Sequence, residues 1–213
     1  SIKISTAGSL TVEQSEFLQT SANKGGALAI DSVGTVSMSF TNFTGNSGAL
    51  GGSLWLNEAA NTTLLNNTFT SNSAADQGGA IYLACVASCA TRFIGNTFIG
   101  NSARLTGGAV KWDSERPTFS SDNSFINNTA MYGKDIAAFA VGLKVENTGN
   151  LSEFVVSGQP VKFPIILGLV DPLSQLVANE NNDICEMTAS EGSYVTGIYK
   201  QTSTNGLIAF SDF

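Results

Sequence analysis

The sequence predicts an all-β protein: a right-handed parallel β-helix (solenoid) over residues 1–145, followed by an incomplete immunoglobulin-like or filamin-like β-sandwich over residues 146–213. Two phrases recur through the first two thirds, a Phe-x-x-Asn motif and then a Gly-Gly pair, with periods of 26, 26, 29 and 27 residues. Periods of this size indicate a repeat array. Short alternating segments such as Val36–Phe40 predict strands, and no apolar period of three to four residues predicts a helix.

The recurring Phe and Asn residues are expected to stack from one coil to the next. Strands of successive coils lie about 4.8 Å apart, so equivalent side chains sit above one another and side-chain amides can bond along the stack. The Gly-Gly pairs are expected at sharp turns between sheets. The predicted phenylalanine column is Phe17, Phe43, Phe69, Phe98 and Phe125, and the predicted asparagine ladder is Asn46, Asn72, Asn101 and Asn128.

These repeats carry a resemblance to known families. Phe-x-x-Asn followed by Gly-Gly-Ala-Ile, as in Gly78–Ile81, resembles the repeat of the chlamydial polymorphic outer-membrane proteins. The chain is also similar to large right-handed β-helix surface proteins of ciliates, in which a phrase similar to Ala130–Ala137 closes the helix before a sandwich segment. The resemblance covers about residues 9–140 and implies adhesive or structural roles at a cell surface. It supplies no catalytic residue.

Composition limits the classes of partner. A net charge of −7 and only ten Lys and Arg residues argue against nucleic acid and against an anionic membrane surface. Five N-glycosylation sequons favour an extracellular or cell-surface glycoprotein, although chance is the alternative in a chain so rich in Asn, Ser and Thr. The sequon asparagines are Asn42, Asn61, Asn66, Asn127 and Asn150, of which Asn61 and Asn66 are expected to lie in a loop.

The cysteines agree with an oxidising compartment. Cys85 and Cys89 fall in the longest repeat, where a local disulfide would close an inserted loop. Zinc is the alternative, but two thiols in a chain without His leave a structural zinc site short of ligands. Cys185 is left over, either free and buried or paired with a residue outside this sequence.

The ends of the chain predict an excerpt of a longer polypeptide. No signal peptide opens the sequence, no segment is long and apolar enough to span a membrane, and Ser1–Ser5 already has the pattern of a strand. After Leu151 the pattern changes to a strand over 161–170, a turn at 171–174 and further strands at 184–189, 194–199 and 207–210. This is too short for a full sandwich, so self-association by strand addition, or a neighbouring domain, is the expected protein partner.

Catalysis is the competing function, because parallel β-helices host polysaccharide lyases and glycosidases. Asp113 and Glu115, with Arg116, form the best acidic cluster for such chemistry, but a solvated loop is the simpler explanation. Asn179–Asp183 offers oxygen ligands without a calcium motif. Trp55 and Trp112 occupy comparable places after their Gly-Gly pairs and could form an exposed aromatic stripe that binds sugar, but packing beneath a loop is the commoner arrangement. We therefore expect a non-catalytic module without cofactor or metal, with a carbohydrate-active enzyme or a glycan-binding module as alternatives.

Overall fold

The computed structural model describes residues 1–86, 88–113, 115–147, 164–188 and 197–211, and the chain divides into two compact units, Ser1–Phe139 and Ala140–Phe213. Across these described ranges the secondary structure consists of strands, and no helix has the length and apolar character needed to cross a membrane. The all-β prediction is therefore confirmed.

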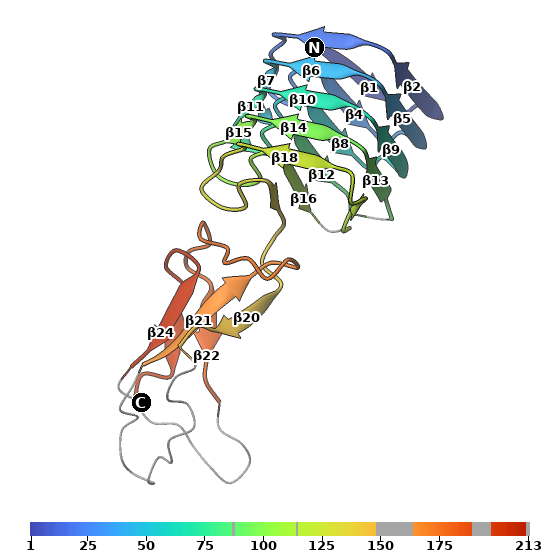
Figure 1. Ribbon diagram of the computed structural model, residues 1–213. Helices are drawn as coiled ribbons and strands as arrows, with labels where there is room; N and C mark the ends of the chain where they lie inside the picture. Colours follow the sequence, from blue (N-terminus) through green and yellow to red (C-terminus); the bar gives the residue numbers. More distant parts are fainter. Residues whose placement is uncertain (87, 114, 148–163, 189–196, 212–213) are drawn as a thin grey trace. The chain divides into compact units, whose positions relative to one another are not determined.

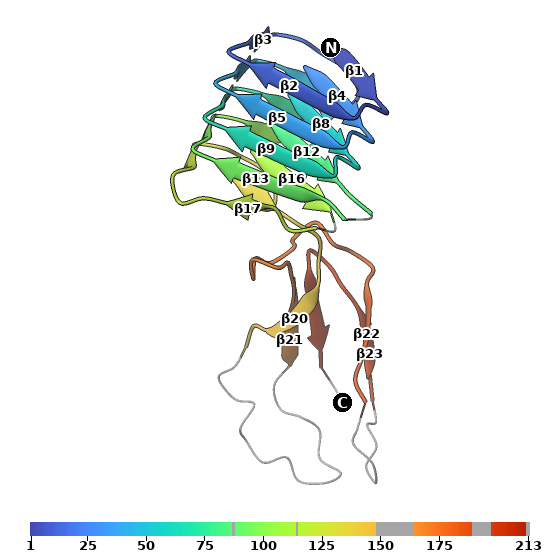
Figure 2. The same cartoon turned by 90° about the vertical axis from the view of Figure 1, so that its right-hand side faces the viewer.

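The first unit is a parallel β-solenoid of about five turns, in which every turn passes through up to four parallel sheets. Figure 1 and Figure 2 show the strands of successive turns lying above one another. Sheet A contains β1 (Ile2–Ser5), β4 (Leu28–Asp31), β8 (Leu54–Asn57), β12 (Ile81–Ala84), β16 (Val110–Asp113) and β19 (Ile136–Ala137). Sheet B contains β2 (Ser9–Glu13), β5 (Thr35–Ser39), β9 (Asn61–Leu65), β13 (Ala90–Ile94) and β17 (Thr118–Phe119).

Two further sheets complete the turn. Sheet C contains β3 (Glu16–Leu18), β6 (Asn42–Thr44), β10 (Thr68–Thr70), β14 (Thr97–Ile99) and β18 (Ser124–Ile126). Sheet D contains β7 (Ser47–Leu50), β11 (Ser73–Gln77) and β15 (Ser102–Ala103). In every sheet the repeat motifs pair with one another, as Phe69 pairs with Phe43 and Phe98. A slip of one residue would turn the buried side chains outward, so the apolar pattern fixes this register.

The interior of the solenoid is filled by stacked side chains. The predicted phenylalanine column is present: its ring centroids are 4.8–5.0 Å apart and neighbouring rings are within 6° of parallel. Sheet B supplies a second inner column that sequence analysis did not identify. Its members are Val12, Met38, Leu64, Phe93 and Phe119, and the ring of Phe93 lies 6.2 Å from that of Phe98 in the first column.

The Gly-Gly pairs allow the turns between sheets D and A to pack closely from one coil to the next. A Cβ atom placed on Gly79 would lie 2.0 Å from the carbonyl oxygen of Gly108, well inside van der Waals contact. The preceding Gly78 has a positive φ of 67°, a conformation that glycine adopts without steric strain. Both glycines are therefore required by the backbone path, as the sequence predicted for the turn between sheets.

The second unit contains two small antiparallel sheets among its described residues. One sheet has the order β20 (Gly142–Val145), β21 (Ile165–Val170), β24 (Leu207–Phe210), and the other pairs β22 (Ile184–Glu186) with β23 (Lys200–Thr202). The predicted turn at 171–174 is present, since Ser174 N–H donates to the Asp171 carbonyl oxygen at 2.9 Å. Residues 194–196 of the strand predicted at 194–199 lie outside the described residues, as do residues 161–163; residues 197–199 are not extended into a strand, and β23 begins at Lys200.

One detail of the predicted domain organisation changes. Sequence analysis placed residues up to 145 in the β-helix, but β20 pairs antiparallel with β21 and so belongs to the second unit. The boundary therefore follows Phe139. The immunoglobulin-like topology stays a prediction, because the described strands of this unit do not define a sandwich.

Candidate functional site

The predicted asparagine ladder joins successive coils at the corner between sheets C and D. Each Asn side chain donates from Nδ2 to the Oδ1 atom of the Asn in the next coil, at 3.0–3.1 Å for Asn46 to Asn72, Asn72 to Asn101 and Asn101 to Asn128. The same Nδ2 atom also donates to the carbonyl oxygen of a column phenylalanine one coil back. These asparagines are 0–3 % exposed, so their polar groups are used inside the solenoid.

A second ladder lies at the corner between sheets B and C and was missed by sequence analysis. Asn67 donates to Asn96 Oδ1 at 3.1 Å and Asn96 donates to Asn123 Oδ1 at 3.2 Å, while the Thr41 N–H bonds Asn67 Oδ1. The available signal is an Asn two residues before the column phenylalanine, as in Asn67-Thr68-Phe69. The two ladders therefore flank sheet C on both sides.

The predicted disulfide is present at the corner between sheets A and B. Residues 85–89 connect β12 to β13, whereas residues 58–60 connect β8 to β9, so the bridge closes an enlarged corner. The Cys85 and Cys89 Cα atoms are 6.2 Å apart. Glu58, one coil back, accepts the Val86 N–H at 2.7 Å and so holds this loop against the previous corner.

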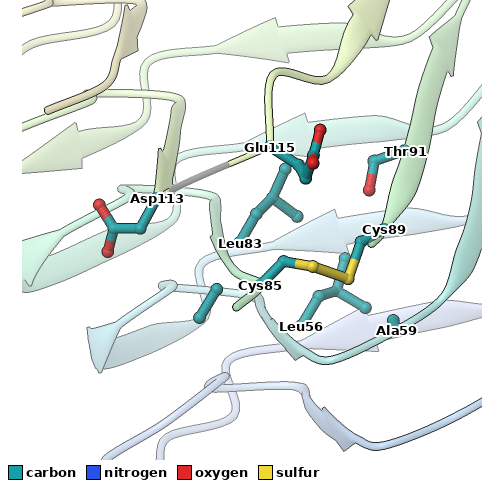
Figure 3. A pocket seen from close by; sticks show the side chains of 9 residues that line it. Leu56, Ala59, Leu83, Cys85, Cys89, Thr91, Asp113 and Glu115 are labelled. Atoms are coloured by element: carbon teal, nitrogen blue, oxygen red, sulfur yellow. A yellow bond between two sulfur atoms is a disulfide. The ribbon is translucent and has the colours of Figure 1, made fainter. Parts of the chain in front are cut away.

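A small pocket beside the disulfide brings together the predicted acidic residues. Asp113 and Glu115 both line it, with Cys85, Cys89 and Thr91 among the other lining residues. The volume of this pocket is about 10 Å³, which is room for about one water molecule and not for a sugar ring. Figure 3 shows the Asp113 carboxylate directed away from the disulfide, on the opposite side from Glu115. Two carboxylates that flank one substrate bond would instead face each other.

Asp113 belongs to a polar network on the outer side of sheet A. The Tyr82 hydroxyl donates to Asp113, and Lys111, whose side chain is only 5 % exposed, forms an ion pair with it at 2.5 Å. Burial, followed by the hydrogen bond to Asp113, raises the pKa of Tyr82. Farther along the same sheet, a hydrogen bond from Asn57 lowers the pKa of Asp31. Asp113 is thus held by a tyrosine and an ammonium group.

Trp55 and Trp112 do not form the exposed aromatic stripe that was the alternative for them; both rings are packed. The two residues occupy adjacent register positions of sheet A, because Trp55 pairs with Tyr82 whereas Trp112 pairs with Leu83. Neighbouring positions on a strand face opposite sides, so one ring points outward and the other inward. Both are covered, at 7 % and 1 % exposure, and Lys24 Nζ lies 4.3 Å from the Trp55 ring centroid.

The four sequon asparagines within the described residues, Asn42, Asn61, Asn66 and Asn127, are all exposed. Asn42 and Asn61 begin strands β6 and β9 and are exposed, so the loop expected at Asn61 is wrong: the strand begins at that residue, directly after the short corner 58–60. Asn66 and Asn127 occupy corners with positive φ, directly before the ladder residues Asn67 and Asn128. Asn150 lies outside the described residues.

Metal-ligand geometry is sparse in the described ranges. Glu58, Cys85 and Cys89 form the one group there whose ligand atoms lie within 4.8 Å of one another, but both sulfur atoms are in the disulfide. Asn179–Asp183 does not gather such a group; Asn181 Nδ2 bonds the Asn179 carbonyl oxygen, and Asp183 interacts with Ser203. Cys185 lies half-buried in β22 without a disulfide partner among the described residues.

Comparison with known proteins agrees with this geometry. The family model described as "Right handed beta helix region" matches residues 1–157. No curated protein and no solved structure matches the chain. The more specific resemblance to the chlamydial polymorphic outer-membrane proteins therefore stays a prediction. On the extent of the family match, together with the stacked parallel coils, the chain belongs to the right-handed β-helix family.

Proposed function

We propose that this chain is a non-catalytic structural or adhesive module of an extracellular or cell-surface glycoprotein, acting as a filament subunit or as a surface repeat protein. The observation that carries the proposal is the pair of asparagine ladders, whose buried side chains bond from coil to coil. The side-chain amides of these asparagines bond to neighbouring coils, so they stabilise the stack and do not face a substrate.

The mechanism would be mechanical. Every coil interface combines parallel backbone pairing with ladder bonds and a stacked aromatic ring, so bending the solenoid would disturb all three at once. A stiff element of this kind displays its outward rows and corners at fixed spacing. Binding to partner proteins, through self-association or through neighbouring domains of a longer chain, would then use these rows and corners.

The acidic residues give the proposal further support. Asp113 is engaged by Tyr82 and Lys111, and Glu115 points elsewhere. A general acid of a glycosidase needs a raised pKa and a groove that holds the sugar. The pocket that contains Asp113 and Glu115 is too small for that task.

The alternative is a carbohydrate-active enzyme or a glycan-binding module. Domains matched by this family model occur both in structural or adhesive proteins and in carbohydrate-active enzymes. The observation in favour of an enzyme is that Asp113 and Glu115 line one pocket.

Three measurements test the proposal. The chain is secreted from a eukaryotic host, its sequons are mapped by glycopeptide mass spectrometry, and its assembly is followed by electron microscopy. In parallel it is incubated with plant and microbial polysaccharides beside an Asp113→Asn/Glu115→Gln variant. We expect occupied sequons, assemblies or surface binding, and no new reducing ends. Depolymerisation by the native chain that the double variant loses would overturn the proposal.

A further inference from the structure

One corner of the solenoid contains an unfavourable residue. Between sheets B and C, Gln14, Phe40, Asn66 and Gly95 all have positive φ, at 46°, 51°, 53° and 63°. Positive φ is tolerated by Gly and Asn but is an outlier for a bulky aromatic residue, with a cost of about 1–2 kcal/mol. Phe40 is also 56 % exposed. It therefore combines backbone strain with an aromatic ring in water.

The next residue along this corner is the acceptor of a sequon. Ser39 pairs with Leu65, and the Phe40 N–H donates to the Leu65 carbonyl oxygen at 3.1 Å, so Phe40 and Asn66 occupy equivalent places in adjacent coils. Stacked residues of adjacent coils are separated by the spacing of the ring column, 4.8–5.0 Å. Because the two residues share a backbone conformation, their side chains leave the corner in similar directions.

The Asn66 side chain is oriented along this column. Its Oδ1 atom lies 2.2 Å from the position that a Cβ on Gly95 would take, so the amide oxygen faces the coil beyond Asn66. The Nδ2 atom is on the other branch of the amide, away from Gly95. Nδ2 is the atom to which an N-glycan is attached.

We propose that Asn66 carries an N-glycan whose first N-acetylglucosamine ring packs on the exposed face of Phe40. In the transfer a bond forms between Asn66 Nδ2 and C1 of the sugar, the bond from C1 to the pyrophosphate of a lipid-linked donor breaks, and the displaced amide proton passes to the medium. The apolar C–H face of the sugar covers the ring and removes both surfaces from water. This inference rests on the proposed secretion of the chain as a glycoprotein.

The other described sequons lack such a partner. Asn61 pairs with Thr35 and Ala90, Asn42 pairs with Glu16 and Thr68, and the corner of Asn127 follows that of Gly100. Among the four described sequons, Asn66 is thus the one with an aromatic residue at the equivalent position of an adjacent coil. Asn61, on β9 of the same coil, is its matched control.

Two substitutions separate the glycan from the corner. Phe40→Gln introduces the residue that this corner already contains at Gln14, and Thr68→Val removes the sequon without changing Asn66. In the glycosylated chain, Phe40→Gln should lower the melting temperature by about 2–4 °C. In the Thr68→Val background, which has no glycan at Asn66, the same substitution should leave the melting temperature nearly unchanged, because Gln keeps the same positive φ, as Gln14 does, and the ring that is lost is exposed.

A second readout is enzymatic release of the glycans from the folded protein. Phe40→Gln should accelerate release at Asn66 by a factor on the order of five and leave release at Asn61 unchanged. Occupancy at Asn66 should not change, because transfer precedes folding. Equal melting shifts in both backgrounds, or an Asn66 that stays unmodified while Asn61 is glycosylated, would overturn the inference alone. Secretion without a glycan at any sequon would overturn the proposed glycoprotein as well.

Discussion

Removing one internal rung of the asparagine ladder should destabilise the solenoid far more than removing an exposed asparagine. Asn101 occupies the middle of the ladder and its side chain makes four hydrogen bonds: it donates to Phe69 O and Asn128 Oδ1, and it accepts from the backbone and side-chain nitrogens of Asn72. Asn101→Ala deletes all four. The backbone N–H of Asn72 then loses the Asn101 side-chain acceptor at a buried position.

The magnitude follows from these bonds. A buried neutral hydrogen bond contributes about 1 kcal/mol, and a buried donor left without a partner costs about 1–3 kcal/mol. Four lost bonds therefore predict a decrease of about 4 kcal/mol in the free energy of unfolding. Protein from a bacterial host, which leaves the sequons unmodified, is unfolded in urea and followed by circular dichroism.

The control is Asn42→Ala, at an exposed asparagine on the outer face of sheet C, which should change stability by less than about 0.5 kcal/mol. Asn96→Ala in the second ladder should resemble Asn101→Ala, because Asn96 is equally buried and bonded. A loss below about 1 kcal/mol for Asn101→Ala would refute the view that the ladders hold the coils together.

Three further predictions concern the corners and the outer network. Gly79→Ala should lower the free energy of unfolding by at least about 3 kcal/mol, because the new Cβ meets backbone atoms. At Gly100 no atom lies nearer than 3.7 Å to such a Cβ, so Gly100→Ala should cost only the strain of positive φ, about 1 kcal/mol. Urea unfolding of the two variants measures both losses. Replacing Cys85 and Cys89 by Ser should lower stability by about 2 kcal/mol, the loop-closure value for so short a loop, and a loss above 4 kcal/mol would contradict it. Tyr82 has a raised pKa, so the stabilisation by its neutral hydroxyl is complete below pH 10 and is lost as the pH rises further. The urea midpoint of the native chain should therefore decrease between pH 9 and pH 11, and the decrease should be smaller in Tyr82→Phe. An equal decrease in both proteins would contradict the assignment.

Much of the architecture was predictable because, in a stack of coils, residues one repeat period apart in the sequence lie in contact. Phe69 and Phe98 are 29 residues apart and still pair, since the additional residues of that repeat are accommodated at the disulfide corner and at an irregularity in β11. The column and the first ladder need only the repeat period and the parallel register. Both follow from the sequence once the period is recognised.

The second ladder and the opposite orientations of the two tryptophans were not predictable in the same way. Asn67 and Asn96 occupy positions where Asn is also common as a turn residue. Because the chain is rich in Asn, their recurrence does not distinguish a ladder from ordinary turns. Trp55 lies three residues after its Gly-Gly pair and Trp112 lies four residues after its own. This difference of one residue places the two side chains on opposite faces of sheet A. Such a difference becomes visible only when the start of each strand is known.

The ladders also restrict where this chain can acquire a binding function. A ladder asparagine must match the same position in the coils on both sides, so a change there has to be made in several coils at once. A corner position has to satisfy only its backbone conformation, and the corner between sheets B and C accepts Gln14, Phe40, Asn66 and Gly95 at nearly the same φ. Exchange of the residues at positions 40 and 66 should therefore leave the fold intact and move only the surface chemistry by one coil. A fold lost on that exchange would show that the corners take part in the stacking after all.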